Sequence, residues 1–303
     1  MAYINPIELL DLGETQDLSP TLIKREKKRL LAEFELNDAV EIEVGNQSLD
    51  KARLIQLFEE LENEELRAFH LKIYQHQSLH RFLAEANLDL FYDQQIHALQ
   101  GQTADFLQFL APHFAKPFNQ RLLNAIRQKD LDETRVLCQV PLPIPVAYQA
   151  ACFQNSYRYL HEQINEIDAL SQRMEEGEAP SGKIQEVCDE MLIDLLNLLP
   201  AYFDGVRDRY GLALESLALQ VQNSHQRVQL SIFIIKQGLK LRTSPDTERR
   251  LQYVLDQLQK LAPLETFMET LTGGSSGKKK KGQYWWYALG VGAVIWLLAQ
   301  WLF

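Results

Sequence analysis

Residues 19–36 read SPTLIKREKKRLLAEFEL, and this stretch predicts an amphipathic α-helix. Ser19 is a residue type that caps a helix N-terminus, and Pro20 suits the first turn because its missing N–H would have no partner there. Apolar side chains recur at the spacing that covers one side of a helix: Leu22, Ile23, Leu30, Leu31 and Phe34. Helical patterns follow through most of the chain, so we expect an all-α fold.

The opposite side of this helix carries a dense positive charge, although the whole chain has a net charge of −10 at pH 7. A basic run on a helix is often only a solvated face. Here the contrast with the acidic chain makes it the predicted partner-binding surface, which would face an acidic region of another protein. Its residues are Lys24, Arg25, Lys27, Lys28 and Arg29.

The next stretch predicts a single β-hairpin followed by two helices. Residues 40–44 alternate apolar and charged side chains and are followed by Gly45-Asn46, a dipeptide typical of tight turns. The spacing of apolar residues over 50–61 and 64–74 predicts helices, the second of them capped by Asn63.

The order of these segments resembles the four helices of a J domain, the module with which co-chaperones stimulate a DnaK-type chaperone. The resemblance covers about the first 75 residues, through NPIELLDLG, SPTLIKREKKRLLAEF, ARLIQLFEEL and ENEELRAFHLKIY. Aligned through Ile23, the place of the family's His-Pro-Asp tripeptide is taken by Glu35, Leu36 and Asn37. The resemblance therefore implies the fold and a docking surface, while the residues for stimulating the ATPase are missing.

The remaining body of the chain also predicts helices. Over 76–178 their faces are rich in aromatic residues, with breaks expected at Pro112 and Pro117 and an extended connector at 141–145. One long helix is expected over 148–174, before a stretch rich in glycine, proline and charge. A bundle with faintly tetratricopeptide-like packing is expected over 183–268, with Ser244 as an N-cap and helices over 184–199, 201–221, 226–241 and 245–261.

The last twenty residues, 284–303, read YWWYALGVGAVIWLLAQWLF and contain no side chain that is charged at neutral pH. As a helix they would span the roughly 30 Å hydrocarbon core of a bilayer. We therefore predict a transmembrane tail anchor behind a flexible basic linker over 269–283, with the preceding domains in the cytoplasm. Small residues in this span would permit pairing into a homo-oligomer. The predicted membrane contacts are Lys278, Lys279, Lys280, Lys281, Trp285, Trp286, Trp296 and Trp301.

The sequence offers little chemistry, so we expect no enzyme, no cofactor and no metal. It lacks phosphate-binding glycine loops and a nucleophile elbow. Its net negative charge argues against binding of nucleic acid. His70, His76 and His80 could in principle clasp zinc, but a solvated helix face is expected for them. The three cysteines have no C-x-x-C spacing and suit a reducing compartment. The charged residues of 204–209 are expected to form surface pairs.

Taken together, the sequence predicts a membrane tail-anchored, non-enzymatic adaptor that docks protein partners at the cytoplasmic face. The expected organisation is a J-like module over 1–75, a middle region over 76–178, a bundle over 183–268, the linker and the tail. Two alternatives stay open at this point. One is a membrane-recruited co-chaperone of a DnaK-type chaperone, and the other is an oligomerising membrane effector.

Overall fold

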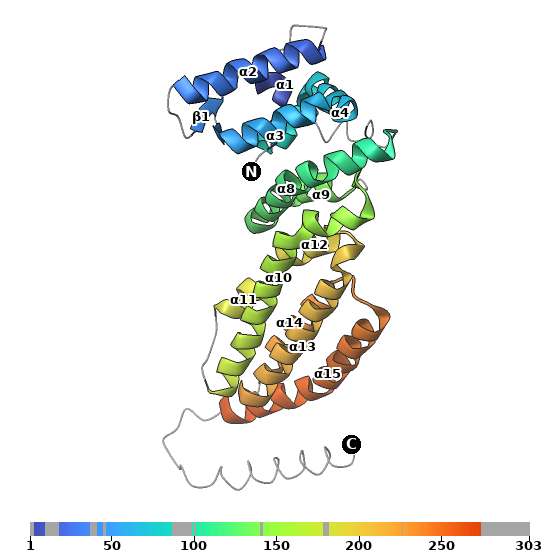
Figure 1. Cartoon of the computed structure of the whole chain (residues 1–303). Coiled ribbons are helices and arrows are strands. Elements are labelled where there is room, and N and C mark those ends of the chain that lie inside the picture. Colours follow the sequence, from blue (N-terminus) through green and yellow to red (C-terminus); the bar gives the residue numbers. More distant parts are fainter. Residues whose placement is uncertain are drawn as a thin grey trace.

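The computed structural model describes residues 3–9, 18–36, 41–44, 47–86, 99, 101–139, 142–177, 182–225 and 227–273. These residues form helices and one two-stranded sheet, so the all-α prediction is confirmed for the described part of the chain. Figure 1 shows a small N-terminal module, in blue, above a longer bundle whose colours run from green to red.

The N-terminal module is a helical hairpin with a short β-hairpin at its turn. Its elements are α1 (Pro6–Leu9), α2 (Pro20–Leu36), β1 (Glu41–Val44), β2 (Gln47–Asp50), α3 (Lys51–Glu62) and α4 (Glu64–Gln75). The strands pair antiparallel, with Glu41 opposite Asp50, which confirms the predicted hairpin. Its helices enclose a small core made of Ile7, Ile23, Leu30, Phe34, Leu54, Phe58 and Leu61.

Side-chain caps explain where the helices of this module begin. The Leu22 N–H donates to Ser19 Oγ at 3.4 Å, and the Arg53 N–H donates to Asp50 Oδ1 at 2.7 Å. Asn63 accepts from two backbone N–H groups at the start of α4, as predicted. These caps satisfy donors that have no partner within a helix, so the sequence sets these boundaries locally.

The bundle contains the longer helices and a second, larger core. Its elements are α5 (Gln77–Glu85), α8 (Ala104–Gln128), α9 (Leu131–Gln139), α10 (Val146–Glu175), α11 (Lys183–Val187), α12 (Glu190–Leu198), η1 (Ala201–Phe203), α13 (Asp204–His225), α14 (Val228–Gly238) and α15 (Pro245–Gly273). Helix α10 packs against α8 and α13, α13 packs against α14, and α14 packs against α15. One apolar cluster extends through these layers from Tyr3 to Leu258.

Several predicted boundaries in the bundle are wrong. Pro112 and Pro117 lie inside α8 and do not end it. A proline costs a helix interior about 3 kcal/mol, but α8 buries Phe106, Phe114 and Phe118, each worth roughly 1.5–3 kcal/mol. Burial of this aromatic face against α5, α9 and α10 therefore keeps the helix intact.

Three further boundaries differ from the predicted ranges. The stretch 184–199 is split into α11 and α12 because Asp189 accepts the Met191 N–H at 3.1 Å and starts a new helix. Helix α14 ends at Gly238. Helix α15 begins after the predicted cap Ser244, whose Oγ accepts the Thr247 N–H at 3.4 Å, and continues to Gly273 into the stretch predicted as linker.

The transmembrane part of the fold prediction is corrected. Among the residues that the structure describes, no helix combines the length and the apolar character needed to cross a membrane. The long helices carry charges along their exposed faces, as α10 does at Arg158 and Glu162. The stretch 284–303, with Trp285, Trp286, Trp296, Trp301 and the preceding lysines 278–281, lies outside the described residues. The tail-anchored, single-pass membrane assignment is therefore withdrawn.

A buried arginine joins three parts of the bundle. Arg207, on α13, is only 5% exposed, and its Nη1 donates to the carbonyl oxygens of Leu196 at 3.0 Å and Leu199 at 2.9 Å. Its Nε donates to the Arg242 carbonyl oxygen at 3.1 Å, and Nη2 pairs with Asp204. The guanidinium thus satisfies carbonyls at the end of α12 and in the turn between α14 and α15.

Two neighbouring side chains hold the same turn. Asn197 donates to the Lys240 carbonyl oxygen at 2.8 Å and accepts the Arg242 N–H at 2.7 Å. Asp208 Oδ1 accepts the Ser244 N–H at 2.7 Å. The interpretation of residues 204–209 as surface pairs is therefore wrong for Arg207 and Asp208, which bind backbone groups.

Replacing Arg207 by Met is expected to lower the free energy of unfolding by about 3 kcal/mol, because three backbone carbonyls lose a charged donor. Arg207→Lys is expected to recover only part of this loss, since an ammonium lacks the planar fork. Urea unfolding followed by circular dichroism measures the effect. Arg249→Met is the control, because Arg249 pairs with Asp246 on the exposed face of α15 and its loss should cost under about 0.5 kcal/mol. Equal losses in the two variants would contradict the role of Arg207.

Candidate functional site

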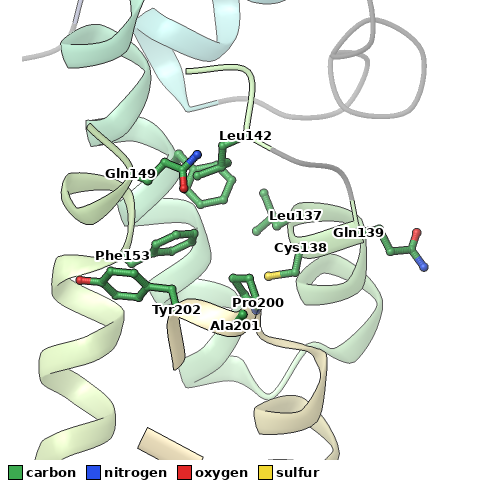
Figure 2. A pocket seen from close by; sticks show the side chains of 10 residues that line it. Leu137, Cys138, Gln139, Leu142, Gln149, Phe153, Pro200, Ala201 and Tyr202 are labelled. Carbon is green, nitrogen blue, oxygen red and sulfur yellow. The ribbon is translucent and has the colours of Figure 1, made fainter. Parts of the chain in front are cut away.

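The bundle contains an open apolar cavity of about 360 Å³ between α8, α9, α10 and η1. We call it the α10 pocket. Figure 2 shows Phe153 and Tyr202 on one side of it and Leu137 and Cys138 on the other. None of its lining residues is charged: Phe118, Leu137, Cys138, Gln139, Leu142, Gln149, Phe153, Pro200, Ala201 and Tyr202.

Local backbone features bring these side chains together. Lys129 ends α8 in the left-handed conformation, with φ 55°, so the chain reverses and α9 returns beside α8. This reversal brings Leu137 and Cys138 into the pocket lining together with Phe118. On the other side, Pro200 disfavours continuation of α12, and the 3₁₀ turn η1 that follows presents Ala201 and Tyr202.

The pocket opens onto an aromatic surface along α10. Val146, Gln149, Phe153, Tyr157 and His161 follow one another at steps of three or four residues and so share one side of the helix. We call this row the α10 stripe. At 1.5 Å per residue it is about 22 Å long.

Exposed apolar groups lie beside this opening. Tyr202 is 45% exposed, Tyr157 is 40% exposed and Val146 is 80% exposed. The Tyr202 ring centroid lies 4.9 Å from that of Phe153 and 6.0 Å from that of Tyr157. The Tyr157 and His161 rings are 4.4 Å apart, so the contacts continue along the stripe. Exposed apolar and aromatic groups that adjoin an uncharged cavity are typical of a binding site.

The protein environment disfavours the charged forms of Cys138 and His161 at this surface. Burial raises the pKa of the Cys138 thiol to about 12, so the reactive thiolate is scarce. Burial, together with the positive charge of Arg209, lowers the pKa of His161. Arg209 Nη1 donates to His161 Nδ1 at 3.3 Å, which fits a neutral imidazole. The arrangement supplies shape and apolar contact for binding, and it pairs no nucleophile with a base.

The predicted basic surface lies elsewhere, on α2 of the N-terminal module (Figure 1). Its charges are partly compensated by carboxylates. Arg29 pairs with Glu26 at 2.7 Å and with Glu33 at 2.8 Å. Arg25 also pairs with Glu26, at 3.2 Å, and Lys27 pairs with Glu62 of α3 at 3.0 Å. Lys24 and Lys28 are exposed and form no ion pair within the described residues. The role of these five cations in binding a partner stays a prediction.

His70, His76 and His80 all lie within the residues that the structure describes. Within the described part of the chain, no group of three His, Cys, Asp or Glu side chains is placed to hold a metal ion. The expectation of a solvated face is wrong for His70, which is only 1% exposed. Its Nδ1 lies 2.8 Å from the Tyr3 hydroxyl, and its Nε2 lies 3.1 Å from Glu60 Oε2.

These contacts belong to a polar cluster where the N-terminal module meets α8. The Tyr3 N–H donates to the Leu83 carbonyl oxygen at 3.3 Å, and the Tyr3 ring meets His113 of α8 edge to face at 4.9 Å. Burial raises the pKa of Tyr3, so its hydroxyl keeps its proton. Burial acts to raise the pKa of Glu60, but the hydrogen bond and charge of His70, together with the charges of Arg53 and His113, lower that pKa overall. Because Tyr3 and His70 are buried, the cluster has a structural role.

No family model, curated protein or solved structure matches this chain. The J-like resemblance of the first 75 residues therefore stays a prediction. Sequence reasoning missed the α10 pocket altogether. One signal for it was present, because the spacing of residues 146, 149, 153, 157 and 161 places uncharged side chains in one row directly after a proline-rich connector.

Stability is expected to fall in acid because of His113. Burial, with the charge of His70 as a smaller contribution, lowers the pKa of His113 from 6.5 to about 4. In the unfolded chain His113 therefore binds a proton below about pH 6.5, whereas in the folded chain it binds one only near pH 4. Between these pH values this difference lowers the free energy of unfolding by about 2–3 kcal/mol. His113→Phe should lose correspondingly less stability between about pH 7 and about pH 4.

Urea unfolding at a series of pH values measures the difference. His76→Gln controls for the loss of a histidine outside the polar cluster. The explanation is wrong if the stability of wild type and of His113→Phe changes with pH to the same extent.

Proposed function

We propose that this protein is a non-enzymatic adaptor, and that the α10 pocket with the α10 stripe is its docking surface for a partner protein. The observation that carries the proposal is an uncharged cavity that opens directly onto exposed aromatic side chains. Aromatic residues are enriched at protein interfaces, and the cores of interfaces are depleted of charge.

The dimensions favour a peptide segment over a small molecule as the occupant. Small-molecule sites enclose most of the ligand surface. Here the surface continues past Phe153 of the cavity along the α10 stripe to His161, over about 12 Å. The cavity volume, about 360 Å³, suits one or two large apolar side chains, which would serve as the anchor of a longer segment.

The rim provides groups that suit a polypeptide backbone. Gln139 and Gln149 line the cavity, and each carboxamide can both donate and accept hydrogen bonds. Tyr202 also lines the cavity, and its phenol is a further polar group of this side chain. The proposed occupant is therefore an apolar or aromatic side chain presented by a segment of another protein.

Selection from a phage-displayed library of random short peptides, with the full chain as bait, tests the proposal. Peptides with an aromatic or large aliphatic side chain are expected to be enriched. Tyr202→Ala removes the exposed wall, and Ala201→Glu places a charge at the opening. Each change should lower the affinity for the selected peptides about tenfold or more. Truncating an important interface side chain typically costs over about 1 kcal/mol of binding free energy.

Tyr253→Ala is the matched control. Tyr253 is 61% exposed on α15, away from the pocket lining, so its truncation should change affinity less than about twofold. Fluorescence anisotropy with labelled peptides gives the affinities, and circular dichroism confirms that each variant is folded. The proposal fails if no peptides are enriched, or if the enriched peptides bind Tyr202→Ala and Ala201→Glu as well as they bind wild type.

A further inference from the structure

A positive charge lies at the far end of the α10 stripe. Arg209, an exposed residue of α13, contacts His161, the last residue of the stripe, through the 3.3 Å hydrogen bond from Nη1 to Nδ1. The α10 pocket thus lies toward one end of an aromatic row, and a guanidinium lies at the other end.

This guanidinium is not neutralised by the residues that the structure describes. Its hydrogen-bonded partner, His161, supplies no negative charge, and burial and Arg209 lower the pKa of the imidazole. The acidic neighbour in sequence, Asp208, instead accepts the Ser244 N–H. No ion pair of Arg209 is formed within the described ranges, whereas Arg207 on the same helix pairs with Asp204. Arg209 therefore keeps a full charge and most of its donors.

The distance between the two ends sets the spacing that a partner must match. Phe153 of the pocket and His161 are eight residues apart on α10, which corresponds to about 12 Å along the helix. An extended peptide covers this distance with about four residues.

We infer that the segment bound at this site is acidic: it places an apolar or aromatic side chain in the α10 pocket and, about 12 Å away, an Asp or Glu carboxylate on Arg209. The inference rests on the proposed function, because it concerns the partner of the same site. Arg209 is suited to this role because a guanidinium can bind a carboxylate through two parallel hydrogen bonds.

A preference for acidic peptides would be unexpected from the net charge of the chain. At −10 the protein as a whole repels acidic segments, so an acidic preference has to come from a local cation at the site. Because Arg209 is exposed, its carboxylate pair is expected to strengthen binding about two- to fivefold, and salt should screen the effect.

The experiment compares peptide selections on the full wild-type chain and on the Arg209→Gln chain. Wild type is expected to enrich peptides with an aromatic residue and an acidic residue about four positions away. Arg209→Gln should keep the aromatic preference and lose the acidic one. Arg249→Gln is the matched control, since Arg249 is an exposed arginine on α15 and should leave both preferences intact.

One selected peptide and its acid-to-amide counterpart then complete a double-mutant cycle by fluorescence anisotropy. Arg209→Gln should lower the affinity for the acidic peptide about two- to fivefold at about 50 mM salt and leave the affinity for the amide peptide unchanged. Near about 500 mM salt, wild type and Arg209→Gln should bind the acidic peptide equally well.

The outcomes separate the inference from the proposed function. Enriched peptides that need Tyr202 but show no acidic preference would overturn the role of Arg209 and leave the docking site standing. An acidic preference that persists in Arg209→Gln would also overturn the inference. If no peptide is enriched, or if Tyr202→Ala and Ala201→Glu leave the peptide affinity unchanged, the proposed docking site is wrong.

Discussion

The buried guanidinium of Arg207 is the contact on which the architecture around the α10 pocket depends. It binds the last carbonyls of α12, directly before η1, and the turn between α14 and α15. Because η1 supplies Ala201 and Tyr202 to the pocket, a single side chain on α13 fixes one wall of the cavity. The same helix carries Arg209 two residues later, at the end of the α10 stripe. One turn of α13 thus carries both a residue that stabilises the fold, Arg207, and a residue of the proposed binding surface, Arg209.

The bundle surrounds this contact with layers that bury aromatic and aliphatic side chains. Helix α10 is central because it packs against both α8 and α13. One side of it therefore belongs to the core, and part of the remaining surface is left as the α10 stripe. Packing against these two neighbours holds α10 as a helix, because most helical stability in proteins comes from tertiary packing.

Local signals in the sequence predicted much of the helical framework. Ser19, Asn63 and Ser244 cap helices as expected, and the alternation of residues 40–44 correctly indicated a strand. These features depend on neighbours within a few residues, which a sequence displays directly. The strong apolar run at 284–303 gave the membrane prediction, and no described helix can cross a membrane.

Features that depend on distant partners were not predictable in the same way. Pro112 and Pro117 indicated a break, but burial of the aromatic face of α8 outweighs the lost hydrogen bonds. Arg207 resembled a surface charge, since its carbonyl partners do not belong to its own helix. The α10 pocket combines residues from four elements, of which only the row on α10 shows a regular spacing.

The place of Tyr3 has a consequence for the order in which the protein assembles. Tyr3 packs in the large core of the bundle, whereas Ile7, four residues later, packs in the small core of the module. During synthesis Tyr3 leaves the ribosome early, but its partner His70 follows 67 residues later and His113 later still. Tyr3 can therefore make these contacts only after His70 and α8 have been synthesised. Only then does the loop close, at an entropic cost that grows slowly with its length.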